Sequence, residues 1–368
     1  MSEIRNKVIT ISGEPVSGKS TVVKSLKEKY EAMGYNVHVI LTGHFFRDII
    51  MREYLKMYPN RKDANLADVQ VDETFAHKRN EIDKLVDEEM RKKGIEINNK
   101  ERPNDVYIID SRLAWHNIPT SYAVRLTIDE RIAGERAFKD ETRGPEDRYK
   151  TVEESTQKTR ERKLGEIKRY KERYGVDLSD PENYDLIVDT AYSNTNELAN
   201  IIIEGEQAYR KGEYYPKMWA SPASFIGTQS DITTAGPSGD YRCTPEELAE
   251  IMERDGYDPK KGEIVILENY GQKFVKDGHH TCMATLIIGK TLVPYIVDKS
   301  KDSNIRMKSE QNNIYFAYDW SDCIKYYGGK IGNNSQFKDF SIEKLTSYEG
   351  RIKGMLEKLQ TPNNGDGR

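Results

Sequence analysis

The sequence has few cysteines and no long apolar run. Its three cysteines, Cys243, Cys282 and Cys323, are widely spaced and form no CxxC pair, which argues against a disulfide framework or a zinc site and is typical of a reducing compartment. The longest apolar runs are far too short to span a bilayer, and no signal peptide is visible at the start. We therefore expect a soluble protein of the cytoplasm, which would be the host cytoplasm for a viral protein.

An excess of basic charge is also missing. The formal net charge is −4, so any site for a polyanion requires a local cluster of basic residues. The 368 residues exceed what one hydrophobic core usually organises, and the apolar fraction of 36% is enough to fill two modest cores. We therefore expect two domains and no general affinity for nucleic acid.

An octapeptide near the start, GEPVSGKS at residues 13–20, matches the phosphate-binding motif GxxxxGK[ST]. A β-branched run over residues 7–12 comes directly before it, and apolar residues at helical spacing follow from Lys19 onward. A chance match in a glycine loop would not require a strand before it and a helix after it. We therefore predict an ATP-binding loop at this position.

Each fixed position of this motif has a physical role. Gly13 and Gly18 let the backbone curl so that successive N–H groups face a phosphate, with the positive end of the helix behind them. Lys19 can reach the β- and γ-phosphates, and the Ser20 hydroxyl can ligate Mg2+. Ser17, inside the loop, is assigned to the same ATP site.

Strands and helices alternate along the first half. Strand-like runs follow the motif at residues 36–41, 105–110, 122–128 and 184–189, and helical patterns at residues 64–93 and 151–173. This order predicts an α/β fold, with a parallel sheet and helices on both faces. Asp110 ends one strand at the carboxyl edge of the sheet, where it can hold the water shell of the metal or meet an acceptor hydroxyl. The alternative for Asp110 is a cap of the following segment.

Arginine is concentrated between residues 130 and 175. The arginines of this segment are Arg131, Arg136, Arg143, Arg148, Arg160, Arg162, Arg169 and Arg173. Interleaved Glu and Lys are typical of a solvated helix held by i,i+4 pairs. A lid that closes on phosphates needs arginine in particular, because its planar fork binds phosphoryl oxygens. We expect two or three of these arginines to be catalytic and the others to lie on the surface.

Residues 5–205 resemble the cytidylate kinases of the short archaeal type, a branch of the P-loop nucleoside monophosphate kinases. The stretches that carry the resemblance are ITISGEPVSGKST, TGHFFRDI, IDSRLAW and RKLGEIKRYKERYGVDLSDPENYDLIVDT. The resemblance implies that Lys19, Ser20 and Thr21 serve ATP and Mg2+. It also implies that Arg47 and Arg112 hold the acceptor phosphate.

The same resemblance makes Arg162 and Arg169 the arginines of the lid. Two positions depart from the family: His44 replaces the acid that follows TG, and Gly165 stands where a serine is usual. Because acceptor discrimination depends on paired polar groups, these changes leave the acceptor open. His44 is a changed base reader, a general base or a tolerated loop residue.

The second half has a different character. Residues 209–241 form an irregular connector, and then Thr244 to Glu247 give a capping signature for an amphipathic helix. A predicted hairpin, the helix TCMATLIIG and the strand TLVPYIVD follow. This order, over about residues 215–300, resembles the smaller α+β ParB-like domain that ParB partition proteins share with sulfiredoxin and a free-serine kinase. We expect domains at 1–205 and 206–300 and a C-terminal extension at 301–368.

In the ParB-like family, the loop at the DGHH position contacts nucleotide phosphates. The resemblance therefore implies a second phosphate site at Asp277, Gly278, His279 and His280, where a helix start favours an anion. The alternatives are a purely structural turn and, less favoured, a metal site.

Three functions remain open. The favoured one is an ATP-dependent kinase of a hydroxymethyl-pyrimidine base in DNA, similar to the phage 5-hydroxymethyluracil DNA kinases, which would reach the base by flipping it or by melting the duplex. The second is a kinase of free CMP, dCMP or another pyrimidine nucleotide, and the third is a non-catalytic switch that binds nucleotide. In both kinases Lys19, Mg2+ and the lid arginines spread charge from the γ-phosphoryl group, and Asp110 or His44 orients the acceptor hydroxyl.

Overall fold

The computed structural model describes two compact units of the chain. The described residues are 6–61, 63, 69, 75, 78–99, 101–140, 148–229, 243–259, 263–269, 272–299, 305–306 and 315–316. Described residues of 1–187 and 202–212 form the first unit, and those of 188–201 and 213–368 form the second. No helix in these ranges is long and apolar enough to cross a membrane.

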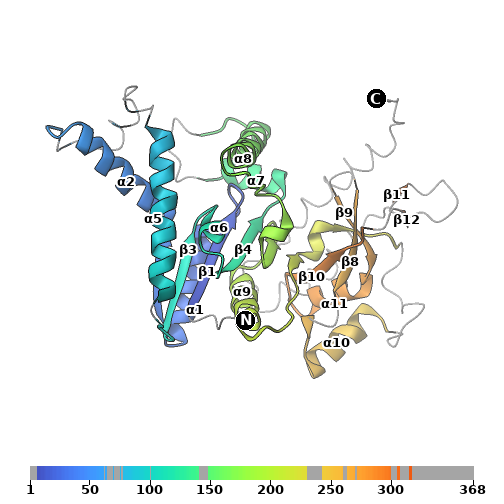
Figure 1. The fold of residues 1–368 in the computed structure, drawn as a ribbon. Coiled ribbons are helices and arrows are strands. Elements are labelled where there is room, and N and C mark those ends of the chain that lie inside the picture. The colour runs from blue at the N-terminus through green and yellow to red at the C-terminus, as the bar shows by residue number, and fades with distance from the viewer. Residues whose placement is uncertain are drawn as a thin grey trace. The chain divides into compact units, whose positions relative to one another are not determined.

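The first unit is built on a parallel sheet. Its strands are β1 (Lys7–Gly13), β2 (Asn36–Leu41), β3 (Asp105–Asp110), β4 (Tyr122–Thr127) and the first half of β5 (Leu186–Asp189), in the order β2-β3-β1-β4-β5. Figure 1 labels β1, β3 and β4. β3 is parallel to β2 and to β1, and β1 is parallel to β4. The register places Asp110 beside Ile11 on one side and Leu41 on the other. The loops that follow these three strands therefore leave the sheet at one edge.

Helices cover both faces of this sheet. They are α1 (Lys19–Ala32), α2 (Thr42–Met57), α5 (Arg79–Asn99), α6 (Ala114–Asn117), α7 (Glu130–Phe138), α8 (Val152–Tyr174) and the second half of α9 (Thr195–Lys211). On one face, buried side chains of α2, α5 and α6 form a core with Val8, Tyr107 and Ile109. The alternate residues Ile9 and Ile108 are also buried and point to the opposite face, and α1 packs against β1, β2 and β3. The predicted α/β architecture is confirmed.

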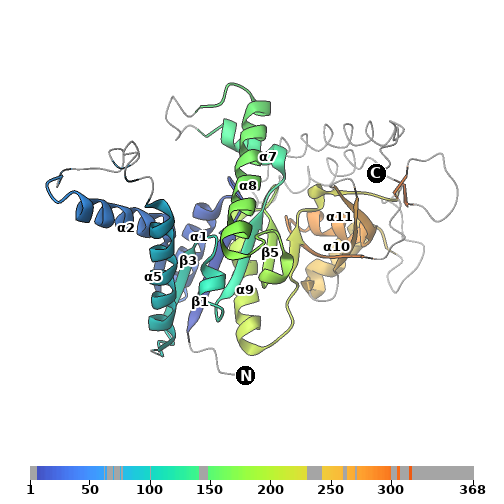
Figure 2. The ribbon, with the colours of Figure 1, turned by 45° about the horizontal axis from the view of Figure 1, so that its top comes forward.

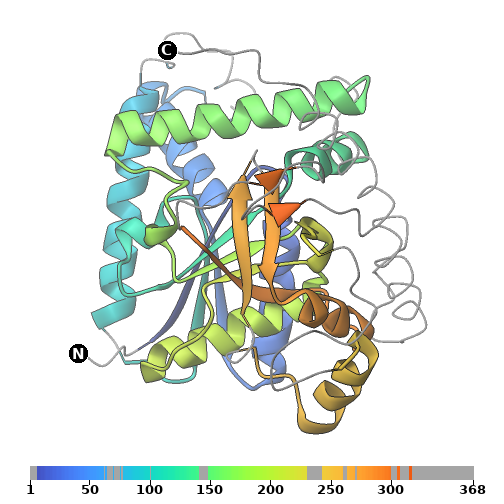
Figure 3. The same cartoon turned by 90° about the vertical axis from the view of Figure 1, so that its right-hand side faces the viewer.

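The longest helix, α8, lies over the carboxyl end of the sheet and packs against α7. Figure 2 labels both helices, and in Figure 3 α8 is the long light-green helix that extends from α5 to α7. The Thr151 side chain caps its start by accepting from the Glu154 N–H, and Gly175, with φ 68°, ends it. A Cβ at Gly134 in α7 would lie 2.0 Å from Thr156 Oγ1, so the close contact of the two helices requires glycine there. The helix predicted at 151–173 is confirmed.

The other long helix of the sequence prediction, at 64–93, differs from the structure. The observed helix α5 begins at Arg79 and ends at Asn99, while most of residues 64–77 lie outside the described residues.

The second unit contains a mixed sheet. Its strands are β6 (Met218–Ala220), β7 (Phe225–Ile226), β8 (Ile264–Asn269), β9 (Gln272–Asp277) and β10 (Val293–Val297), in the order β6-β10-β8-β9-β7. β8 and β9 form the predicted antiparallel hairpin, and β10 is parallel to β8 and antiparallel to β6. The helices α10 (Pro245–Asp255) and α11 (His279–Ile287) pack against each other.

Local signals of this second unit are confirmed where the structure describes them. Thr244 and Glu247 form the capping box at the start of α10, with each side chain accepting a backbone N–H of the other residue.

Short 3-10 helices lie at Pro181–Asn183 in the first unit and at Pro222–Ser224 in the second. Within 301–368 the structure describes only β11 (Ile305–Arg306) and β12 (Tyr315–Phe316), which pair in parallel. The helix predicted at 342–359 lies outside the described residues.

Candidate active site

The loop between β1 and α1 has the backbone that phosphate binding requires. Val16 and Gly18 have positive φ angles of 64° and 80°, and Gly18 directly precedes the first residue of α1. A Cβ at Gly13 would lie 2.7 Å from Ser17 Oγ and 2.9 Å from Lys19 Cγ, so the loop folds back on its own start. The N-terminal end of α1, which is the positive end of the helix dipole, adjoins this curled loop. The loop is therefore a favourable place for phosphate.

The side chains at the start of α1 fit ATP and Mg2+. Lys19 is half-buried, as a residue that reaches along phosphates inside a loop would be, whereas Ser20 and Thr21 are exposed in the first turn. An exposed hydroxyl directly after the lysine is accessible to a cation that bridges phosphate oxygens. Lys19, Ser20 and Thr21 would therefore hold the phosphates and the metal.

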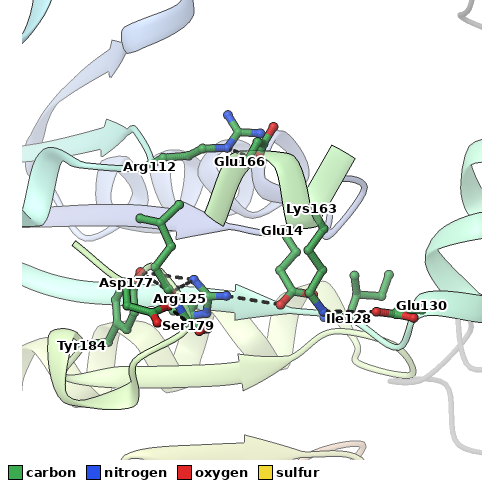
Figure 4. Close-up of polar contacts among 11 residues, drawn as sticks. Glu14, Arg112, Arg125, Ile128, Glu130, Lys163, Glu166, Asp177, Ser179 and Tyr184 are labelled. Atoms are coloured by element: carbon green, nitrogen blue, oxygen red, sulfur yellow. Dashed lines mark hydrogen bonds and ion pairs between the residues drawn. The ribbon is translucent and has the colours of Figure 1, made fainter. Parts of the chain in front are cut away.

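Four more charged residues gather around Lys19. Burial lowers the pKa of Lys19, Arg112 and Arg162 lower it further, and Asp110 and Glu166 act in the opposite direction. Arg112 Nε donates to Glu166 Oε2 at 2.6 Å, and Arg162 Nε donates to Glu166 Oε1 at 3.2 Å. Figure 4 shows Arg112 and Glu166 facing each other across the end of the sheet. Helix α8, which is the predicted lid and is called the lid helix below, and the loop after β3 therefore each place an arginine close to the phosphate loop.

Asp110 lies where the sequence analysis predicts it, at the end of β3 and beside Ile11 in β1. Burial raises the pKa of the Asp110 carboxyl, while Lys19 and Arg112 oppose that rise. A carboxylate that is partly desolvated and lies within the field of two cations can orient a metal-bound water or a proton of the acceptor.

A second charged group joins the phosphate loop to α8, and the sequence analysis did not identify it. The carboxylate of Glu14, inside the motif, is buried with 8% of its side chain exposed. Its oxygens lie 3.2 Å from Arg125 Nη2 and 3.1 Å from Lys163 Nζ, and the Ile128 N–H donates to it at 3.3 Å (Figure 4). The local indication of this role in the sequence is the acidic side chain itself, which stands at a motif position where any residue type is allowed.

The arginine-rich segment contributes unequally. Arg162 and Arg169 are both exposed. Arg162 pairs with Glu166 and acts on Lys19, whereas Arg169 lies over the ring of Tyr170, 5.2 Å from its centroid. Burial raises the pKa of Tyr170, and Arg112 and Arg169 both lower it. Arg169 therefore lies at the margin of the region around Arg112. Others form helix-surface contacts, such as the pair of Arg160 with Glu130 at 3.5 Å.

Two predicted site residues, His44 and Arg47, lie on α2, the helix that directly follows β2. Arg47 is exposed, and in the described part of the chain no contact joins it to Lys19 or Arg112. The backbone of His44 is in the first turn of α2, but its side chain lies outside the described residues. Both residues keep their roles as predictions.

In the second unit, the DGHH loop forms a turn before α11. The Gly278 N–H donates to Asp277 Oδ1 at 2.8 Å, and a Cβ at Gly278 would lie 2.7 Å from Ile264 Cδ1. His279 is buried, with Nε2 3.1 Å from Thr228 Oγ1, and burial lowers its pKa to about 4. His280 is half-buried. These contacts favour a structural role for His279, and phosphate contact by the loop stays a prediction.

Comparison with known proteins agrees with this geometry. Residues 8–192 match the sequence model of the cytidylate kinase-like family. The chain is 31% identical to the cytidylate kinase of Natronomonas pharaonis over 204 residues, which cover 55% of this chain and 90% of that relative. It is 30% identical to the cytidylate kinase of Methanothrix thermoacetophila over 183 residues, which cover 50% of this chain and 88% of that relative.

A third relative extends through the second unit. It is the S-adenosylmethionine-dependent nucleotide dehydratase of Lacinutrix mariniflava, with 30% identity over 389 aligned positions that cover 94% of this chain and 74% of the relative. The parallel sheet, the phosphate loop and the match over residues 8–192 lead to one conclusion. The chain belongs to the cytidylate kinase-like family of P-loop kinases.

Proposed function

We propose that this protein is an ATP-dependent kinase that transfers the γ-phosphoryl group to a free pyrimidine nucleoside monophosphate. The observation that carries the proposal is that Arg112 and Arg162 share the Glu166 carboxylate and both act on Lys19 of the phosphate loop, with Asp110 at the end of the strand next to β1. Three cations at one edge of a parallel sheet fit a reaction in which negative charge moves between two phosphates.

The donor side consists of the loop and the first turn of α1. The curled backbone from Gly13 to Gly18 and the Lys19 ammonium would bind the β- and γ-phosphates, and Ser20 would hold Mg2+. The bound metal supplies charge neutralisation at the phosphates. Arg162, carried by α8, would reach the transferring group when the lid lies over the loop.

The acceptor side is cationic, which favours an acceptor that carries a phosphate. Arg112 follows β3 directly and would bind the acceptor phosphate, because a guanidinium can contact two phosphate oxygens at once. A phosphate acceptor attacks as an anion, whereas the hydroxymethyl group of a base in DNA is neutral and needs a general base. Asp110, whose carboxyl lies within the field of Lys19 and Arg112, would orient a metal-bound water.

The relatives support the same substrate class. Two are named for cytidylate, and the one that also matches the second unit is named for a nucleotide. A hydroxymethyl-pyrimidine in DNA and a non-catalytic nucleotide switch stay as alternatives that experiment can separate.

A substrate panel tests the proposal. Purified protein is incubated with γ-labelled ATP and Mg2+ and with CMP, dCMP, UMP, dTMP, 5-hydroxymethyl-dUMP or duplex DNA with and without 5-hydroxymethyluracil. We expect label in a diphosphate product of at least one pyrimidine monophosphate and none in DNA. Label only in the modified DNA would replace the proposal by the DNA-base kinase, and ATP binding without any transfer would replace it by the switch.

A further inference from the structure

Glu166 lies between the two arginines that the proposed function assigns to phosphate. It is on α8, one turn after Arg162, and its partner Arg112 comes from the loop after β3, 54 residues earlier. Each oxygen of its carboxylate accepts from a different arginine, Oε2 from Arg112 and Oε1 from Arg162. Its side chain is 15% exposed, so the carboxylate is largely withdrawn from water.

The atoms used in these two contacts matter for what the arginines can still do. In both contacts the donor is Nε, and neither contact uses an Nη atom. A guanidinium is a rigid plane with five N–H donors, so a carboxylate that holds Nε fixes the direction in which the terminal Nη groups point. The same arginine can then present its Nη groups to a phosphate while Nε stays bound to the carboxylate.

Charge balance gives a second reason for a carboxylate at this position. Lys19, Arg112 and Arg162 act on one another as like charges, and both arginines lower the pKa of Lys19. Arg112 is 24% exposed and Arg162 58% exposed, and an anion between them offsets the repulsion of their guanidinium groups. Glu166 acts on all three cations, because it pairs with both arginines and also raises the pKa of Lys19.

We infer that Glu166 is a positioning residue that holds Arg112 and Arg162 together, with their Nη groups directed at the acceptor phosphate and at the transferring phosphoryl group. The inference rests on the proposed function for its substrate. Glu166 itself acts through the two arginines and does not contact the substrate.

The substitution Glu166→Gln tests this role with little change of volume. An amide has a single acceptor oxygen, so one arginine must lose its partner and face an N–H2 donor instead. The matched control is Glu161→Gln on the same helix, where the exposed Glu161 pairs with Lys158 at 3.0 Å and with Gln157. The measurements are kcat and KM for ATP and for the preferred monophosphate.

We expect Glu166→Gln to lower kcat/KM for the acceptor by about 10- to 100-fold, because a small misplacement of a charged group at the reacting centre has an effect of this size. KM for ATP should change by less than about threefold, since the P-loop backbone holds the donor. Glu161→Gln should match the wild type. The inference fails if Glu166→Gln matches Glu161→Gln or if KM for ATP rises as much as KM for the acceptor. It also fails if KM for the acceptor falls, because Glu166 would then compete with phosphate for the arginines.

Absence of transfer by the wild type would contradict the proposed function but not yet the role of Glu166. In that case the same three proteins are titrated with inorganic pyrophosphate in a calorimeter. Weaker binding by Glu166→Gln than by Glu161→Gln would support positioning of the arginines, and equal or tighter binding would contradict it.

Discussion

Lys163 Nζ, on the lid helix α8, lies 3.1 Å from Oε2 of Glu14, inside the phosphate loop. The other oxygen of Glu14 lies 3.2 Å from Arg125 Nη2, on β4. One buried carboxylate therefore connects the loop that would bind the donor, the sheet and the helix that would close over the site. We expect the position of α8 relative to the loop to depend on this charge.

Lys163→Met removes the ammonium group but keeps most of the stem. We expect kcat/KM for ATP to fall by about tenfold, the effect of a loss of about 1.4 kcal/mol, because α8 then has one contact fewer with the loop. Lys158→Met, which removes an exposed lysine of the same helix, is the control and should leave kcat/KM unchanged. Equal values for the two variants would show that the contact of Lys163 with Glu14 does not hold the lid.

Arg125→Met tests whether Glu14 and Arg125 stabilise the fold as a pair. Both side chains are buried, with 7% of Arg125 and 8% of Glu14 exposed, and Arg125 also donates to the Tyr184 hydroxyl at 3.2 Å. Breaking a buried pair costs about 3–5 kcal/mol when the other charge is left without compensation, and because Lys163 stays 3.1 Å from Glu14 we expect the lower end, about 3 kcal/mol. The free energy of unfolding in urea should fall by this amount in Arg125→Met. It should recover in part when Glu14→Gln is added, and a purely additive double variant would contradict the pairing.

Asp110→Asn should raise stability at neutral pH while it abolishes turnover. Because burial raises the pKa of Asp110 above its ordinary value of 3.8, its contribution to stability is fully present below 3.8 and is lost as pH rises through the folded-state pKa. The neutral amide avoids that loss, and we expect a gain in the free energy of unfolding at pH 7 that shrinks toward pH 4. Urea unfolding at both pH values checks the sign, and a variant less stable than the wild type at pH 7 would contradict it.

His279→Gln should change the pH dependence of unfolding in the second unit. The pKa of His279 is lowered from 6.5 to about 4, so the unfolded chain binds a proton that the folded chain does not. The contribution of His279 is therefore complete above pH 6.5 and is lost as pH falls toward 4, by about 3 kcal/mol in total.

The measurement is the free energy of unfolding between pH 7 and pH 4. It should fall less steeply in His279→Gln than in the wild type, with His280→Gln as the control. If His279→Gln instead weakens nucleotide binding and keeps the wild-type slope, the phosphate role predicted from the DGHH sequence is the better one.

Local chemistry explains which parts of the fold the sequence predicts. The phosphate loop, the strand that ends at Asp110 and the cap at Thr244 depend on residues within a few positions of one another. Such features are encoded by spacing and turn chemistry alone. β7 has two residues and is too short to show a strand period, so the sequence analysis gave no strand there.

The candidate site depends on distant partners, and this limits what the sequence predicts of it. Glu14 meets Arg125 at a separation of 111 residues, and no local pattern marks either residue as the partner of the other. The composition of α8 likewise does not distinguish Arg162, which reaches the group around Lys19, from Arg160, which pairs with Glu130. In the second unit, Thr228 lies 51 residues before His279 and contacts this buried histidine at the start of α11. Such a distant contact has no local pattern in the sequence.

The central claim is phosphoryl transfer from ATP to a free nucleotide at the site of Lys19. The most direct test compares the wild type and Lys19→Ala in transfer of γ-labelled phosphate to CMP and to the other pyrimidine monophosphates, with unfolding in urea as a check that both proteins are folded. We predict labelled diphosphate from the wild type and at least a 1,000-fold lower rate from Lys19→Ala, about 4 kcal/mol of lost transition-state stabilisation. Transfer by a folded Lys19→Ala at the wild-type rate, or no transfer to any monophosphate by the wild type, would contradict the account.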